Sequence, residues 1–217
     1  MTVRLTSAGA SLIMGPPDVT PSNAVPLALL WSEAVCRAQK LTMGTEAYFN
    51  RVVREMGAIA WNVTDAGEMT YTEASGNATP ADAVVELCGQ YLPTDQQRSL
   101  KTVFDAIGTA AQIPALDSLM TTFWSDKTQT AKGTCFATAP VSMNANGQLT
   151  TTLAYLDFDG SSDRWQSFFL TRMSAETRLH SRHVQLTLNA DLWQCIDKPI
   201  ADKLGKAAVD AIQQIDI

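Results

Sequence analysis

Residues 134–158 read Thr134-Cys-Phe-Ala-Thr-Ala-Pro-Val-Ser-Met-Asn-Ala-Asn-Gly-Gln-Leu-Thr-Thr-Thr-Leu-Ala-Tyr-Leu-Asp-Phe158 and are the most informative segment of the sequence. Within it, Asn146-Gly147 lies between two β-prone runs, which is the strongest short-range signal for a β-hairpin. Before this stretch the apolar residues recur at helical spacing, and after it the pattern is mostly that of strands. The sequence therefore predicts an antiparallel hairpin where a helical half gives way to a β-rich half.

On the N-terminal side, residues 2–14 predict a short strand, and residues 26–125 predict paired helices with an irregular excursion at 62–78 that includes a short strand around 69–72. Two helix starts are expected at Thr45 and at Thr79-Pro80, because threonine is a good N-cap and proline is tolerated in the first turn. Thr94 to Gln97 matches the capping-box pattern and predicts the start of a further helix.

The C-terminal half predicts a β-meander over residues 134–189, with strands at 165–173 and 177–189, followed by a terminal helix at 199–215. These strands follow one another without crossover helices, so the sheet is expected to be antiparallel, with about four to five strands. The expected class is α+β: a single domain, 1–217, in which helical hairpins and the terminal helix pack on the sheet.

Composition excludes some functions. The 217 residues carry a formal charge of −6, and nucleic-acid binding needs a basic footprint, so no nucleic-acid partner is expected. No secretory signal and no run of 18 apolar residues is visible. The protein is expected to be soluble as synthesised, and cytoplasmic or released without a classical signal.

No motif for catalysis, a cofactor or a metal is present. The four cysteines are widely spaced, which favours reduced, buried thiols over a disulfide framework or a zinc site. His180 and His183 are three residues apart on one expected strand, so they are expected on opposite faces. We therefore expect no cofactor, no metal and no enzymatic activity.

Two groups of residues are candidate contact sites. The first group consists of basic side chains in the C-terminal half, which are candidates for contact with anionic lipid or an acidic partner. Charge at strand edges also prevents aggregation, which is the alternative explanation. The residues are Arg164, Arg172, Arg178, His180 and Arg182. The second group belongs to the hairpin, which is a candidate membrane-inserting element because alternating strands either cover a core or line a water-filled pore. Its residues are Asn146, Gly147, Leu149, Leu153 and Tyr155.

The order of the expected elements resembles that of small cytolytic toxins of the Cyt type. The matching features are the strand at 2–14, the helical pairs at 26–61 and 80–125, and the strands at 134–189. The resemblance covers most of the chain in layout, without a shared sequence motif. It implies an α+β fold with long amphipathic strands and an action on membranes, and it carries over no functional residue.

The first functional hypothesis is a non-enzymatic, membrane-active protein, a toxin or virulence factor that acts by membrane association or pore formation. Its partners would be membrane lipids or further copies of itself, with a homo-oligomer in at least one state. The alternative is a structural or interaction protein that self-assembles through a sheet edge or a helix face. A third hypothesis, an enzyme or small-ligand binder built from dispersed residues, requires a pocket lined by convergent polar groups.

Overall fold

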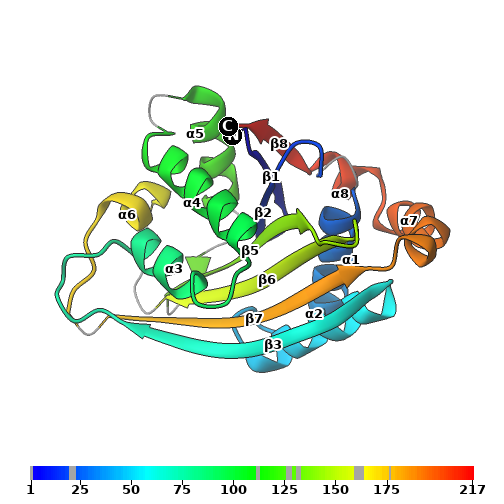
Figure 1. Cartoon of the computed structure of the whole chain (residues 1–217), viewed down its shortest axis with the longest axis horizontal. Coiled ribbons are helices and arrows are strands. Elements are labelled where there is room, and N and C mark those ends of the chain that lie inside the picture. The colour runs from blue at the N-terminus through cyan, green and yellow to red at the C-terminus, as the bar shows by residue number, and fades with distance from the viewer. Residues whose placement is uncertain are drawn as a thin grey trace.

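A mixed β-sheet forms the centre of the molecule (Figure 1). The computed structural model describes residues 2–19, 23–110, 113–125, 129–130, 133–158, 164–175 and 177–217. Seven strands follow the order β3-β7-β6-β5-β2-β1-β8, and β4 pairs with β5. The strands are β1 (Arg4–Ala8), β2 (Ser11–Gly15), β3 (Trp61–Thr72), β4 (Gln129–Thr130), β5 (Gly133–Met143), β6 (Leu149–Phe158), β7 (Arg178–Leu188) and β8 (Gln213–Asp216).

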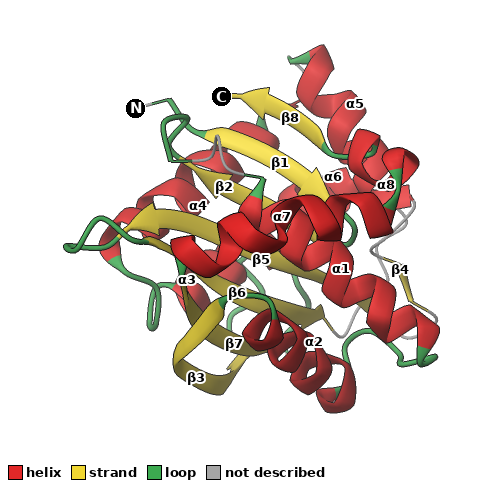
Figure 2. Ribbon diagram, turned by 90° about the vertical axis from the view of Figure 1, so that its right-hand side faces the viewer, coloured by secondary structure: helices red, strands yellow, loops and turns green. Residues whose placement is uncertain are grey.

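Helices cover both faces of the sheet. They are α1 (Ala24–Ala38), α2 (Glu46–Ala58), α3 (Pro80–Cys88), α4 (Thr94–Gly108), α5 (Pro114–Phe123), α6 (Trp165–Leu170), α7 (Ala190–Leu204) and α8 (Lys206–Asp210). Figure 2 looks onto the layer of α1, α2 and α7, with the sheet behind it. Helices α3 to α6 form the layer on the opposite face.

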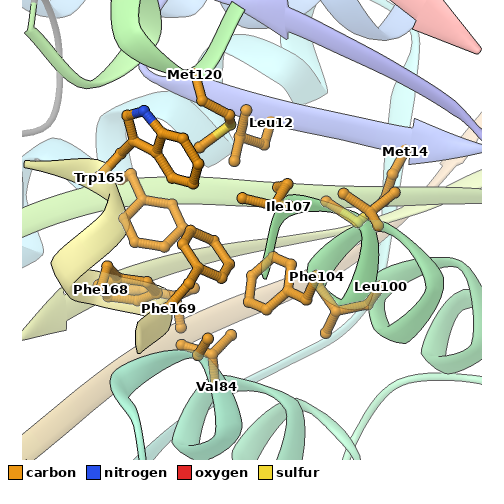
Figure 3. Packing of buried hydrophobic residues seen from close by; sticks show 14 of the residues in the cluster. Leu12, Met14, Val84, Leu100, Phe104, Ile107, Met120, Trp165, Phe168 and Phe169 are labelled. Carbon is orange, nitrogen blue, oxygen red and sulfur yellow. The ribbon is translucent and has the colours of Figure 1, made fainter. Parts of the chain in front are cut away.

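Each layer encloses its own hydrophobic core. The core beneath α3 to α6, called here the α4-side core, includes Leu12, Phe104 and Phe136. Figure 3 shows Phe169 of α6 facing Phe104 of α4, and their ring centroids lie 5.3 Å apart. The core beneath α1, α2 and α7, called here the α1-side core, includes Ile13, Val52 and Leu153. Because both faces are covered, the central strands are buried on both sides.

The α+β class predicted from the sequence is confirmed. Most strand pairs are antiparallel as expected, including β5 with β6 and β6 with β7. One pair is different: β2 runs parallel to β5, with Ile13 opposite Ala139, so the expectation of a wholly antiparallel sheet is wrong. A pairing between segments so distant in sequence leaves no local pattern, which is also why the strand number was underestimated.

Three local predictions are wrong. Residues 2–14 form the hairpin β1–β2, because Gly9 adopts a positive φ of 59° and reverses the chain. Residues 62–78 contain the long strand β3, which pairs with β7 over its whole length, so the short strand expected around 69–72 is the end of a longer one and residues 62–68 are not irregular. Residues 165–173 contain α6, since Trp165, Phe168 and Phe169 recur at helical spacing and pack into the α4-side core.

The C-terminal segment also differs from the expected helix at 199–215. Helix α7 begins earlier, where the Asn189 side chain accepts a hydrogen bond from the Leu192 amide. It ends before Gly205, whose φ of 81° is unfavourable for other residues. The chain then forms α8 and the strand β8, which pairs with β1. A polar strand of four residues has too little periodicity to be recognised from the sequence.

Two of the three helix caps predicted from the sequence are confirmed. Thr45 caps α2, and Thr79 forms a reciprocal capping box with Asp82 at the start of α3. The capping box expected at Thr94 is wrong, because α4 has no side-chain cap and Gln97 donates to the carbonyls of Gly89 and Leu92 instead.

Candidate functional site

The β5–β6 hairpin predicted at Asn146-Gly147 is confirmed. The two strands are joined by residues 144–148, in which Asn144 accepts from the amides of Asn146 and Gln148, and Gly147 has a φ of 73°. Asn146 and Gly147 are exposed, and Leu149 is partly buried. Leu153 and Tyr155, farther along β6, are buried in the α1-side core.

The hairpin face toward α1 and α2 is apolar. It carries Ala137, Ala139 and Val141 from β5, beside Leu153 and Tyr155 from β6. The Tyr155 ring makes edge contacts with two residues of α2, at centroid distances of 5.6 Å to Tyr48 and 5.9 Å to Phe49. Helix α2 therefore shields the apolar side of the hairpin from water.

The opposite face of the same hairpin, toward α4, is rich in hydroxyl groups. Its members are Thr134, Thr138, Ser142, Thr150 and Thr152. The hydroxyls of Thr134, Thr138 and Thr152 are buried and have no hydrogen-bond partner within the described structure. A buried polar group without a partner costs free energy that the same group facing water would not.

The hairpin carries no charged residue from Gly133 to Leu156. The amphipathic part comprises residues 137–143 and 149–155. Membrane-spanning strands are tilted and need about 9–11 residues, so each amphipathic part is a few residues shorter than a full span. The hairpin thus has the alternation and the electrical neutrality of membrane-spanning strands, over most of their length.

The connection between α3 and α4 closes the hydroxyl-bearing face over the adjoining part of β7. The Tyr91 ring stacks on His183 with centroids 3.8 Å apart, and its hydroxyl lies 3.0 Å from the Ser181 hydroxyl. The Gln185 amide donates to the Tyr91 carbonyl at 3.0 Å. Gly67 of β3 leaves room for the imidazole, because a Cβ there would lie 2.9 Å from His183 Cε1. Burial lowers the pKa of His183 below its usual 6.5.

The structure brings only part of the predicted basic group together. Arg178, His180 and Arg182 lie on one face of β7, because alternate residues of a strand share a face. Glu68 of β3 pairs with His180 and with Arg182, the latter at 3.1 Å, which offsets much of their charge. Arg182 also donates to the Gly44 carbonyl.

The remaining two arginines lie outside this strand. Arg164 is exposed directly before α6. Arg172 is exposed after α6, and its guanidinium lies 3.5 Å from the Asn77 side-chain oxygen.

The two histidines lie on opposite faces of β7, as predicted: His180 contacts Thr70 and Glu68, whereas His183 stacks on Tyr91. In the part of the chain that the structure describes, no three His, Cys, Asp or Glu side chains are grouped to hold a metal ion. All four cysteines are free thiols, and Cys195 is exposed, in contrast to the expected burial. Burial raises the pKa of Cys88 and Cys135 to about 12, so these two thiols stay protonated at neutral pH.

Sequence reasoning missed the partners of the hydroxyl-bearing face. Tyr91 and Gln96 come from the helical half of the chain and meet the sheet only through tertiary packing. The threonines themselves were visible in the alternation of the quoted stretch, but their burial was not.

Comparison with known proteins concerns the layout alone. No family model matches the sequence, and no curated protein matches it. The chain is similar to a solved structure titled "DELTA-ENDOTOXIN", at a TM-score of 0.46 and 11% identity over 86% of this chain and 87% of that chain.

A second match is titled "Structure of the Evf virulence factor", at a TM-score of 0.46 and 12% identity over 94% of this chain and 84% of that chain. Among the described residues, no helix combines the length and apolar character needed to cross a bilayer. Both matches concern the layout alone, as did the predicted resemblance to small cytolytic toxins.

Proposed function

We propose that this chain is a non-enzymatic, membrane-active protein in which the helical layers cover a sheet that membrane association releases. The inserting element is the β5–β6 hairpin, with Asn146 and Gly147 at its tip and Leu149, Leu153 and Tyr155 on its lipid-facing side. The arrangement in which both helical layers cover the sheet is called here the closed form.

One observation carries the proposal: an uncharged hairpin with one apolar face and one threonine-rich face, on which the hydroxyls of Thr134, Thr138 and Thr152 are buried without partners in the closed form. Displacing α4 would expose those hydroxyls to water and remove their desolvation cost. Displacing α2 would expose Leu153 and Tyr155, for which hydrocarbon is the better solvent. Both gains favour an opened form at a membrane surface.

A reversible tether between β5 and β2 tests the proposal. The double substitution Ile13→Cys with Ala139→Cys places two thiols on directly opposed residues of neighbouring strands, a separation that suits a disulfide. We expect the oxidised protein to release no dye from liposomes and the reduced protein to regain release. The wild-type chain should release dye from phosphatidylcholine vesicles or from vesicles that also contain phosphatidylserine.

The matched control shares one of the two substitutions. Thr6→Cys with Ile13→Cys joins β1 to β2, which are opposed at these residues and need not separate. This control should release dye whether oxidised or reduced. Wild-type protein that releases no dye from either vesicle would refute the proposed function.

The self-assembling alternative has one specific observation in its favour. Strand β3 lies at one end of the sheet, opposite β8, and presents an edge of 12 residues. However, the edge carries a bulge between Val63 and Asp65 and the carboxylates of Asp65 and Glu68, and such features hinder edge-to-edge pairing. We therefore propose that the closed form is monomeric and that oligomers form after membrane binding. Size-exclusion chromatography with light scattering, in buffer and with lipid, distinguishes the two; a stable oligomer without any lipid effect would favour the alternative.

A further inference from the structure

A cavity of about 330 Å³ lies between the start of α4 and the hydroxyl-bearing face of the sheet. Its mouth is exposed and includes Thr94 and Asp95. Deeper in the cavity, uncharged polar side chains from α4 and three strands converge: Gln96, Ser142, Thr150, Thr152, Gln185 and Thr187. Its volume falls near the lower end of ligand pockets, which span about 300–1,000 Å³.

The hydrogen bonds in this cavity run in one direction. The Gln96 amide nitrogen donates to the Ser142 hydroxyl at 3.1 Å, and that hydroxyl lies 3.0 Å from the Thr150 hydroxyl. The Thr150 hydroxyl donates in turn to the Ser142 carbonyl at 3.1 Å, so the Ser142 hydroxyl is left to donate to Thr150. In this arrangement the Gln96 amide nitrogen is used by Ser142, and the Gln96 carbonyl oxygen is left for another partner.

Two buried oxygen atoms are left over. The Gln96 carbonyl oxygen and the Thr152 hydroxyl have no hydrogen-bond partner in the described chain, and each residue is only 1% exposed. Both residues line the cavity. Both atoms are closed off from the cavity in this arrangement, but buried polar groups are normally satisfied, so a ligand that donates and accepts would supply the missing hydrogen bonds once the two side chains turn toward it.

The start of α4 supplies donors to the same cavity. The first backbone N–H groups of a helix have no partner within the helix, and α4 has no side-chain cap to satisfy them. Thr94, Asp95 and Gln96 belong to this first turn, and all three line the cavity. Ligand oxygen atoms would therefore find N–H donors in the same helical turn that carries Gln96.

The charges and shapes around the cavity narrow the ligand class. No lysine or arginine is among the described lining residues, and Asp95 at the mouth repels anions. No aromatic side chain is among them either, so a flat base has no ring to stack on. We propose that the cavity binds a neutral polyhydroxyl molecule of about the size of one sugar residue. The proposal concerns the closed form and does not require membrane activity.

Titration with defined sugars tests this assignment. The probes are glucose, galactose, mannose, N-acetylglucosamine and inositol, with inorganic phosphate as the anionic comparison, and the readout is the amide NMR spectrum of the full chain. We expect at least one neutral probe to shift the resonances of Thr94 to Gln96 and of Thr152 in a saturable way. Gln96→Leu and Thr152→Val should each weaken that binding roughly tenfold, as expected for a lost ligand hydrogen bond.

Thr138→Val is the matched control. Thr138 is a buried threonine on the same sheet face with an equally unpartnered hydroxyl, but it does not line the cavity. Its replacement should leave sugar affinity unchanged. The assignment fails if no neutral probe saturates, if only phosphate binds, or if Thr138→Val weakens binding as much as Thr152→Val does. If Gln96→Leu does not fold, the comparison of sugar affinity between Thr152→Val and Thr138→Val still tests the assignment.

Discussion

At the residue scale, Thr138 combines full burial with a hydroxyl that has no partner within the described chain. Thr138→Val keeps the shape of the side chain and removes the unsatisfied group, so we expect the free energy of unfolding to rise by about 1 kcal/mol. If this face meets water during membrane insertion, the same substitution should reduce dye release. Urea unfolding and liposome release, measured on one preparation, check both outcomes. A variant that is more stable and releases as much dye as the wild type would show that the hydroxyl-bearing face plays no part in membrane insertion.

Glu73, at the end of β3, is a second residue with a definite pH signature. Its carboxylate accepts from the Ser75 hydroxyl at 2.7 Å, the Ser75 amide at 2.6 Å and the Gly76 amide at 2.9 Å. The bonds from Ser75, followed by those from Tyr71 and Gly76, lower the pKa of Glu73 from 4.5 to about 2.

The folded pKa of Glu73 is below the unfolded one, so its contribution to stability is complete above about pH 4.5 and is lost as the pH falls toward 2. Glu73→Gln should therefore lower the thermal midpoint at pH 7 and have much less effect near pH 2. Thermal melts at both pH values check this, with Glu86→Gln on the exposed side of α3 as the control. Equal losses at both pH values would contradict the assignment.

At the element scale, the segment between α3 and α4 is held to the sheet through the stacked pair of Tyr91 and His183. The His183 ring is buried, and its Nδ1 has no hydrogen-bond partner in the described structure. Asp65 is the charged residue whose field raises the His183 pKa, but desolvation outweighs it and the pKa falls below 6.5. Protonation would place a positive charge between the helical layer and the sheet.

The unfolded or opened form therefore takes up a proton more readily than the closed form. Stability is full above about pH 6.5 and declines as the pH falls through the unfolded pKa toward the lower folded one. We expect dye release to increase from pH 7.5 to about pH 5. His183→Gln should remove most of this increase, whereas His180→Gln, on the opposite face of the same strand, should retain it. An unchanged pH profile in His183→Gln would rule out this residue as the sensor.

At the scale of the whole molecule, the two ends of the chain close one side of the sheet (Figure 1). Val3 and Ile217 exchange backbone hydrogen bonds of 3.0 and 2.8 Å, and β8 pairs with β1 next to the α4-side core. Removing residues 213–217 uncovers the edge of β1 and the apolar surface that Ile215 and Ile217 contact. The free energy of unfolding should fall by about 2–4 kcal/mol, with association through the new edge.

The control for this truncation is Asp216→Asn, which breaks only the ion pair with Arg4. Because that pair is partly exposed and screened by water, its loss should be small beside the effect of the truncation. Urea midpoints and light scattering measure both variants. A truncated chain as stable and as monomeric as the wild type would show that β8 is dispensable for closing the sheet.

The features that could be predicted from the sequence are local ones. The hairpin at Asn146-Gly147, the caps at Thr45 and Thr79, and the opposite orientation of His180 and His183 depend on residues within a few positions of one another. Turn chemistry, capping and strand alternation act over that range, so these predictions needed no knowledge of the tertiary structure.

Only the tertiary structure decided the features that join distant segments. The parallel pairing of β2 with β5, the long β3 on β7, and the burial of the threonine face beneath α4 each bring together residues separated by dozens of positions. Strand pairing depends on what lies opposite, and a polar face is buried only when another element covers it. The alternation of Thr138, Ser142 and Thr152 was therefore visible in the sequence, whereas their burial and the cavity beside Gln96 were set by the packing of α4 on the sheet.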